Sequence, residues 1–155
     1  MEEHGDFTIA WHIPRLYGWA SRVVETQLQD GLAAAGFGDL RPAHLRVFEH
    51  LPRHGARLTD IARRAQATKQ AIGYLVAELE RRGYLERVPD ASDGRASIIR
   101  RTDRGRAADE VVFTILARED QEWRRRLGSK RYDDILAALR DLSAVVVARR
   151  EELGA

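Results

Sequence analysis

The sequence predicts a mainly α-helical protein with one small β-hairpin, an α+β arrangement. Apolar residues recur at helical spacing through most of the chain. Residues 84–88 and 96–101 read instead as strands, and residues 89–95 between them are dense in turn-forming types. A chain of 155 residues with 44% hydrophobic and 32% charged residues fits one folded domain. We therefore expect a single domain over residues 1–155.

The first predicted helix covers residues 9–35 and ends at the glycine-containing segment 36–39. Its apolar stripe is too broad for a free surface helix, so we expect it to pack against a partner. A second helix is expected to begin at Pro42, because proline suits the first helical position. Its buried face is predicted from five apolar residues, namely Ala43, Leu45, Val47, Phe48 and Leu51.

Two short helices joined by a tight turn are predicted next. Thr59 and Thr68 are the expected N-caps, because a threonine hydroxyl can accept a hydrogen bond from a free N–H group at a helix start. The turn falls at Gln66 and Ala67, and Gly83 ends the second helix. Apolar residues at i, i+3, i+4 and i+7 give the second helix one buried face, made of Ile72, Leu75, Val76 and Leu79. This order of elements indicates a helix-turn-helix.

The two predicted strands, residues 84–88 and 96–101, form a hairpin that would serve as a wing beside the helix-turn-helix. The loop at 89–95 is longer than a tight hairpin turn, so we expect it to project. Residues 40–101 thus make up a winged helix-turn-helix lobe. A further helix, capped by Thr102 or Asp103, is predicted to run to about Leu127. Its expected buried residues are Ala107, Val111, Ile115 and Leu116.

A last helix is predicted after the break at Gly128, with Ser129 as its cap. Like the preceding one, it lies outside any winged-helix core, and its apolar stripe is wide. The simplest use of these stripes is a two-fold interface, so we expect residues 9–35 and 103–155 to be dimerisation helices.

Positive charge is concentrated in the middle of the chain. Residues 57–106 hold 12 Lys or Arg against seven Asp or Glu, a net charge of +5, whereas the whole chain carries only +2. A basic middle between mildly acidic flanks is typical of a nucleic-acid-binding face, although an Arg-rich solvated surface would show the same pattern.

The second helix of a helix-turn-helix enters the major groove of DNA by its amino-terminal end. Gln70 can pair with an adenine edge there, and Lys69 can reach a guanine or a phosphate. Arg95 lies where a wing tip could place it in a minor groove, with Asp93 holding its guanidinium. Phosphate contacts are expected from Arg63 and Arg64. The predicted DNA-binding residues are Arg63, Arg64, Thr68, Lys69, Gln70, Gly73, Tyr74, Asp93 and Arg95.

The segment from about Leu40 to Arg106 resembles the MarR (multiple antibiotic resistance regulator) family of winged helix-turn-helix transcriptional regulators. The matching features are residues 58–87 (LTDIARRAQATKQAIGYLVAELERRGYLER), the DASDGR wing at 90–95 and the TDRGR start at 102–106. The resemblance implies a homodimeric repressor that binds a pseudo-palindromic operator on double-stranded DNA. It also implies release by a small effector, in many members a phenolic or other aromatic acid.

Aromatic and basic residues near the amino terminus are candidates for an effector site. An aromatic wall with one cation suits an aromatic carboxylate, although the same aromatics could form the core of a dimer interface. The candidate ligand-binding residues are Trp11, His12, Arg15, Trp19 and His44. A zinc site from His44, His50 and His54 is not expected, because Pro52 interrupts any shared helix face and no cysteine is present.

Several functional classes are not expected. The absence of cysteine excludes disulfides, thiol catalysis and thiolate metal sites. We find no phosphate-binding glycine loop, nucleophile elbow or HExxH motif, so neither an enzyme nor a cofactor is predicted. The acidic amino terminus does not resemble a signal peptide, and no apolar run could span a bilayer, so a cytoplasmic protein without membrane contact is expected. The rival functions are a winged-helix adaptor that binds protein rather than DNA, and a small-molecule transferase whose winged-helix part serves only to dimerise.

Overall fold

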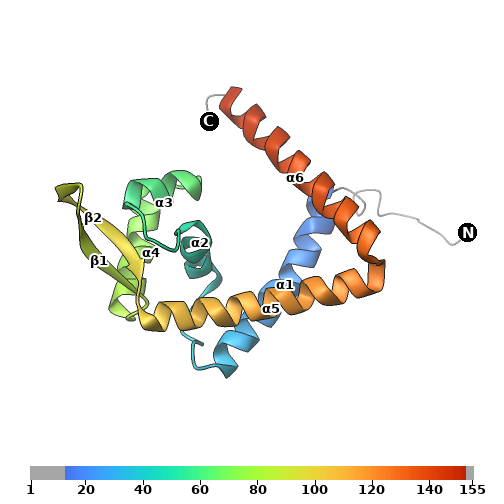
Figure 1. The fold of residues 1–155 in the computed structure, drawn as a ribbon, viewed down its shortest axis with the longest axis horizontal. Helices are drawn as coiled ribbons and strands as arrows, with labels where there is room; N and C mark the ends of the chain where they lie inside the picture. The colour runs from blue at the N-terminus through green and yellow to red at the C-terminus, as the bar shows by residue number, and fades with distance from the viewer. Residues whose placement is uncertain (1–12, 153–155) are drawn as a thin grey trace, which may run out of the picture. The chain divides into compact units, whose positions relative to one another are not determined.

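The fold is that of a computed structural model, which describes residues 13–152. Over this range it confirms the predicted class, because six helices accompany a single two-stranded hairpin (Figure 1). In chain order the elements are α1 (Ile13–Ala34), α2 (Pro42–His50), α3 (Leu58–Arg64), α4 (Lys69–Arg81), β1 (Leu85–Asp90), β2 (Asp93–Arg101), α5 (Asp103–Leu127) and α6 (Ser129–Glu152).

The chain divides into two compact units, residues 1–115 and 116–155, and the boundary falls inside α5. The first unit contains the winged helix-turn-helix, in which α2, α3, α4 and the hairpin surround one hydrophobic core. Its largest fully buried side chains are Tyr84, Leu32, Leu40, Ile61, Ile72, Leu79, Ile99, His44, Val47 and Val76. The predicted apolar face of α4 is therefore buried, except that Leu75 is only half-buried.

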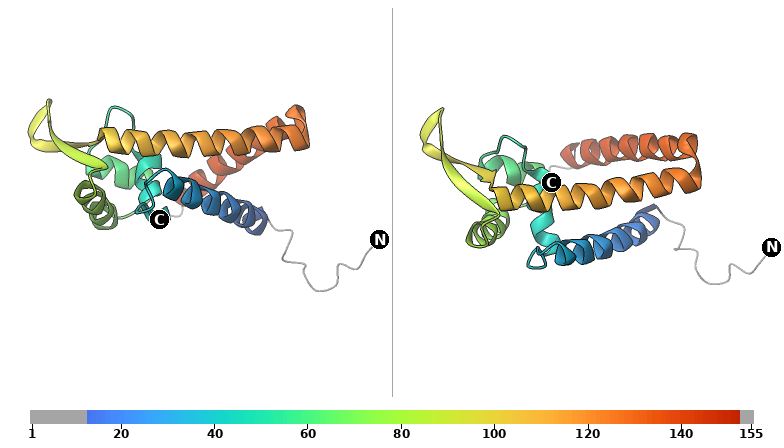
Figure 2. Two further views of the ribbon diagram at one scale, coloured as in Figure 1. Left: turned by 90° about the horizontal axis from the view of Figure 1, so that it is seen from below. Right: turned by 60° about the horizontal axis from the view of Figure 1, so that its bottom comes forward.

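The hairpin is antiparallel, with Leu85 opposite Arg101 and Val88 opposite Ile98. It extends away from the neighbouring helices of the first unit (Figure 2). The chain before α3 joins it, because Ala56 and Ile99 exchange both backbone hydrogen bonds at 2.9 and 3.1 Å. One edge of the wing is thus tied directly to the helix-turn-helix.

The predicted long wing loop is wrong. Asp90 already pairs with Asp93, after a register shift at Pro89, so the strands continue into the segment 89–95. Residues 91 and 92 alone form the turn. The reason is local, because one carboxylate oxygen of Asp90 accepts hydrogen bonds from the backbone N–H and the hydroxyl of Ser92, at 2.8 and 2.7 Å.

Two of the three predicted threonine caps are correct. Thr68 accepts a hydrogen bond from the N–H of Ala71 at 3.1 Å, and Thr102 accepts one from Gly105 at 3.1 Å. Thr59 is not a cap, because α3 begins at Leu58 and its N-cap is Arg57. The burial of two alanines was also predicted wrongly. Ala43 and Ala107 are exposed, since the buried faces of their helices use His44 and Ala108 instead.

The second unit consists of residues 116–127 of α5 together with α6. Tyr132 is its buried anchor, and its hydroxyl donates to Asp120 at 2.6 Å while Arg124 lies over its ring. Much of the apolar stripe on α6 stays open, including Ile135, Val146 and Val147. No helix within residues 13–152 has the length and apolar character needed to cross a membrane.

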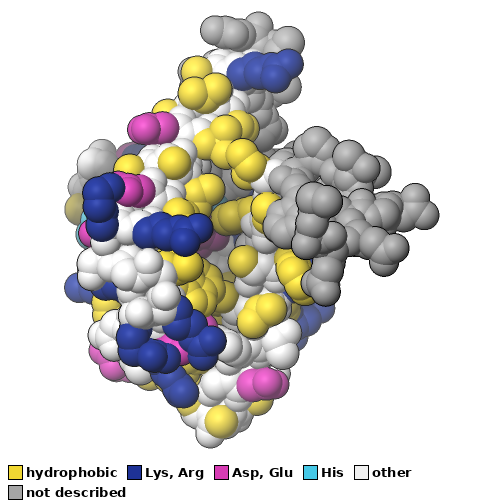
Figure 3. All heavy atoms as spheres, turned by 90° about the vertical axis from the view of Figure 1, so that its right-hand side faces the viewer, with side chains coloured by type: hydrophobic (Ala, Val, Ile, Leu, Met, Phe, Trp, Pro, Cys, Tyr) yellow, Lys and Arg dark blue, Asp and Glu magenta, His cyan; other side chains and the backbone are white. Residues whose placement is uncertain are grey.

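Large apolar side chains are also exposed on α1 of the first unit, where Trp19 is 68% and Tyr17 63% exposed. Apolar side chains, yellow in Figure 3, lie open on the surface. Such exposure is unusual for a monomer and supports the prediction that these helices bind a second copy of the chain.

Candidate nucleic-acid interface

The start of α4 presents polar side chains to solvent. The turn before it contains Gln66 in a left-handed conformation, with φ of 50°, and Thr68 caps the helix. Lys69, Gln70 and Tyr74 are exposed and follow directly on the helix. Because Ile72, Val76 and Leu79 are buried, the rotation of α4 about its axis is set by the core, and these polar side chains face outward as predicted.

Gly73 is among the predicted DNA-binding residues, but it lies on the side of α4 that faces α3. It is half-buried, and a Cβ added there would meet Leu58 at 3.5 Å, which is an ordinary contact. Packing against α3 therefore leaves room for a Cβ at this position and does not by itself require glycine.

The predicted phosphate-binding arginines lie at the end of α3. Arg63 is exposed and forms an ion pair with Asp60 at 2.8 Å, one turn earlier. Arg64 is also exposed. The carbonyl of Ala65 accepts a hydrogen bond from Arg46 of α2 at 3.2 Å, which holds the end of α3 in place. Both arginine side chains can reach a partner outside the protein.

At the wing, Arg95 is exposed on β2. The predicted pair between its guanidinium and Asp93 is absent from the described residues. Asp93 instead accepts a hydrogen bond from the backbone N–H of Arg95 at 3.1 Å, because Arg95 follows it by only two residues in the turn. The other carboxylate oxygen of Asp93 lies 3.6 Å from the guanidinium of Arg57.

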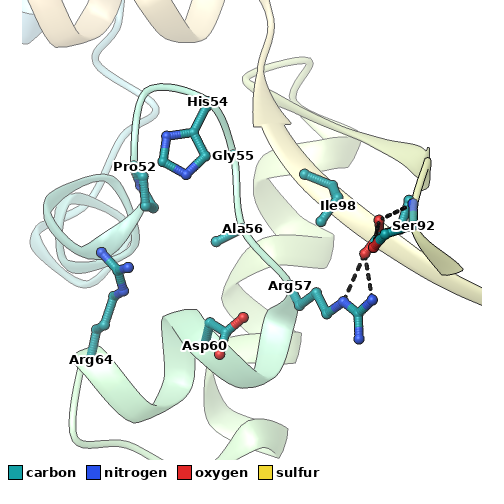
Figure 4. A pocket seen from close by; sticks show the side chains of 10 residues that line it. Pro52, His54, Gly55, Ala56, Arg57, Asp60, Arg64, Ser92 and Ile98 are labelled. Carbon is teal, nitrogen blue, oxygen red and sulfur yellow. Dashed lines mark hydrogen bonds and ion pairs between the residues drawn. The ribbon is translucent and has the colours of Figure 1, made fainter.

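Arg57 also forms a close ion pair that the sequence analysis missed. Its Nε and one terminal nitrogen lie 2.8 and 2.6 Å from the same oxygen of Asp90 (Figure 4). Hydrogen bonds from Ser92 and then from Arg57 lower the pKa of Asp90 to about 2, from an ordinary value of 3.8. The pair borders an open cavity of about 440 Å³ between α3 and the hairpin, which Arg64 and Ile98 also line.

A second missed cluster joins α2 to α4. The side chain of His44 is fully buried, and its Nε2 lies 3.2 Å from Glu78. Its Nδ1 accepts the backbone N–H of Arg41 at 3.1 Å, so the ring proton lies on Nε2 and is donated to Glu78. Arg41 contacts the same carboxylate oxygen. The hydrogen bond from His44, together with Arg41 and Arg82, lowers the pKa of Glu78 despite the opposing effect of burial.

This cluster bears on the predicted ligand residues. With its side chain enclosed and both ring nitrogens engaged, His44 holds α4 in position and offers no free group to a ligand. Arg15 and Trp19 are exposed on α1, whereas Trp11 and His12 lie outside the described residues. The ligand site therefore stays a prediction. Among the described residues, no group of three or more His, Cys, Asp or Glu could hold a metal ion.

A third cluster connects the segment before α2 with the hairpin and α5. The hydroxyl of Tyr84 donates to Asp39 at 2.5 Å, and Arg104 donates to that hydroxyl at 2.9 Å. Arg104 also lies over the Tyr84 ring, with its guanidinium carbon 4.6 Å from the ring centroid. Burial alone would raise the pKa of Asp39, but the hydrogen bond from Tyr84 and the nearby arginines lower it.

A family comparison covers the lobe that holds these clusters. The family model described as MarR family matches residues 39–96, which contain α2, α3, α4, β1 and the start of β2. The winged helix-turn-helix of this chain matches the MarR family model. The family resemblance predicted from the sequence is therefore confirmed over the lobe that carries the candidate DNA-binding residues. No curated protein matches the sequence.

Solved structures with this fold match nearly the whole chain. A DNA complex of MepR from S. aureus is 20% identical, with a TM-score of 0.70, and covers 88% of this chain and 97% of its own. The repressor CouR, bound to a 23-mer DNA duplex, is 22% identical, with a TM-score of 0.68 and coverages of 92% and 99%. PcaV from Streptomyces coelicolor, in complex with its natural ligand, is 20% identical, with a TM-score of 0.65 and coverages of 91% and 98%. These similarities establish the fold.

The Thr68 cap gives a direct test of how the start of α4 is held. Thr68→Ala should lower the free energy of unfolding by about 1 kcal/mol, because the N–H of Ala71 loses its acceptor. Thr68→Ser retains a hydroxyl and should cost only a few tenths of that. Urea denaturation of both variants at one protein concentration measures the difference, and equal losses would show that the hydroxyl does not act as a cap.

Proposed function

We propose that the protein is a sequence-specific DNA-binding transcriptional regulator. The observation that carries the proposal is the exposed, polar start of α4 on a lobe that matches the MarR family model. Lys69 and Gln70 are presented there by a helix whose apolar face is buried in the core. The exposed Arg95 on the wing adds a second reader suited to a minor groove. The DNA-bound structures of MepR and CouR, which share the fold, support this assignment.

The regulator would act as a homodimer on a pseudo-palindromic operator, as a repressor released by a small aromatic acid. The open apolar side chains on α1 and α6 support dimerisation, and residues 1–155 would then act as a single functional domain. Two copies of α4 about one DNA turn apart would set the half-site spacing. The ligand-bound structure of PcaV supports an effector, whose binding would be coupled reciprocally to that of DNA.

Substitution of the two proposed readers tests the assignment. With operator duplexes selected from genomic fragments by the wild-type protein, Gln70→Ala and Arg95→Ala should each weaken binding by about 1–3 kcal/mol per lost base contact. Matched controls are Gln121→Ala and Arg118→Ala, which remove the same side-chain types from exposed positions on α5. Fluorescence anisotropy at fixed salt measures the affinities. Unchanged binding by both reader variants would refute the site.

A winged-helix adaptor that binds protein is the alternative. It predicts that wild-type protein shows no salt-dependent binding to any genomic fragment. A DNA-binding regulator predicts instead an affinity that falls linearly on a log–log plot against salt concentration.

A further inference from the structure

The wing carries two acidic side chains at its turn, on a surface proposed to meet a polyanion. Asp90 and Asp93 lie five and two residues, respectively, before Arg95, the proposed minor-groove reader. Carboxylates so close to DNA phosphates oppose binding electrostatically, so their presence calls for a compensating role. Arg57, which precedes α3, is the cation that faces both of them.

The contacts show what this arginine connects. Arg57 is the N-cap residue of α3, and its neighbour Ala56 is hydrogen-bonded to Ile99 of β2. Its guanidinium forms an ion pair with Asp90, whose side chain is only 10% exposed. Two guanidinium nitrogens lie 2.6 and 2.8 Å from one carboxylate oxygen. The backbone bridge therefore fixes the base of the wing, while the ion pair fixes the hairpin at its turn (Figure 4).

The remaining oxygen of Asp90 is used within the turn itself. It accepts hydrogen bonds from the N–H and the hydroxyl of Ser92. One carboxylate therefore stabilises the conformation of the turn and also connects the turn to the residue before α3. Arg95 follows three residues after Ser92 in the same strand segment. Since the guanidinium of Arg95 has no partner among the described residues, its placement depends on the position of the turn.

We propose that Arg57 and Asp90 are positioning residues that hold the wing at the angle from which Arg95 reaches the minor groove. The proposal rests on the proposed function, because it explains how Arg95 is positioned for DNA binding. The hairpin is attached to the helix-turn-helix at two points. One is the backbone bridge at its base, and the other is the ion pair at its turn, so its orientation relative to α3 is restricted. An unbraced two-stranded ribbon would have to be ordered on DNA at an entropic cost.

The direction in which Asp90→Asn changes the DNA affinity distinguishes a positioning role from a purely electrostatic effect. Asp90→Asn removes a negative charge beside DNA, so electrostatics alone predicts tighter binding. The asparagine oxygen can still accept both Ser92 hydrogen bonds, but its amide group is a poor partner for Arg57. The positioning role therefore predicts weaker operator binding, by about tenfold, in line with the loss of one base contact. Ser92→Ala, which leaves the ion pair intact, is the matched control and should change affinity less.

A double-mutant cycle then shows whether the pair acts through Arg95. Operator affinity is measured for Arg57→Gln, Arg95→Ala and the combined variant. Positioning predicts that the combined variant binds no more weakly than Arg95→Ala alone. A direct phosphate contact by Arg57 predicts additive losses instead. The exchanged pair, Arg57→Asp with Asp90→Arg, should recover part of the affinity that Arg57→Asp loses.

The outcomes separate this proposal from the proposed function. If wild-type protein selects no operator, the DNA-binding function itself fails and the positioning role with it. If wild type binds and Asp90→Asn binds equally well or better, or if the losses in the cycle add, the positioning role is overturned while the function stands. Thermal unfolding of each variant confirms that the affinities refer to folded protein.

Discussion

Gly105→Ala is expected to lower the free energy of unfolding by about 3 kcal/mol. Gly105 lies in the first turn of α5, and a Cβ added there would come 2.1 Å from the backbone oxygen of Tyr84. That oxygen cannot easily move away, because it accepts hydrogen bonds from the N–H and the hydroxyl of Thr102, at 3.0 and 3.1 Å. The clash is therefore with fixed backbone rather than with a flexible side chain.

The higher helix propensity of alanine opposes the steric clash, so the larger of the two free energies decides whether Gly105→Ala destabilises the protein. Alanine is favoured over glycine inside a helix by about 1 kcal/mol, which is smaller than the expected clash. Gly94→Ala is the matched control, because nothing lies within 4 Å of its added Cβ. Urea denaturation at one protein concentration measures both variants, since the stability of the proposed dimer would depend on concentration. Gly105→Ala with wild-type stability would show that α5 starts farther from Tyr84.

Local patterns explain why so much of the fold was predictable. The spacing of Ile72, Val76 and Leu79 predicts the buried face of α4 because only neighbouring residues of one helix are compared. The caps at Thr68 and Thr102 depend on atoms three residues away. The same reasoning failed at Thr59, because a backbone that is already extended at Arg57 starts α3 earlier.

The three side-chain clusters were not predictable in this way. Their central pairs are separated by 33 residues for Arg57 and Asp90, by 34 for His44 and Glu78, and by 45 for Asp39 and Tyr84. No periodicity links residues so far apart, and many charged residues compete as partners. The only hint was Glu78 itself, a carboxylate one residue before the buried Leu79 on α4.

The clusters share a consequence for the proposed function. His44 and Glu78 anchor α4 to α2, while Arg57 and Asp90 brace the wing against the start of α3. Each of the two proposed DNA-reading elements, α4 and the wing, is thus held by its own polar contact in addition to the shared hydrophobic core. Polar contacts specify position more strictly than apolar packing, because a shifted element would leave a donor or an acceptor unpaired.

Tyr84→Ala is expected to cost about 3–5 kcal/mol of unfolding free energy, which is the largest effect we predict for a single side chain. Tyr84 is fully buried at the point where α4 ends and the hairpin begins. Its ring packs edge-on against Phe48, with ring centroids 6.3 Å apart, and lies 6.2 Å from Phe37. Removing the ring would open a cavity among these aromatics and take away the surface on which Arg104 lies.

Tyr84→Phe separates the hydroxyl from the ring. It keeps the packing and should cost only about 1 kcal/mol, because Asp39 and Arg104 lie partly in solvent and can bind water instead. The hydroxyl hydrogen bond lowers the pKa of Asp39, so it stabilises the fold most above the ordinary carboxyl pKa and is lost as the pH falls. The stabilities of wild type and Tyr84→Phe should therefore converge in acid. A difference that stays constant down to acidic pH would show that the hydroxyl acts through packing and not through Asp39.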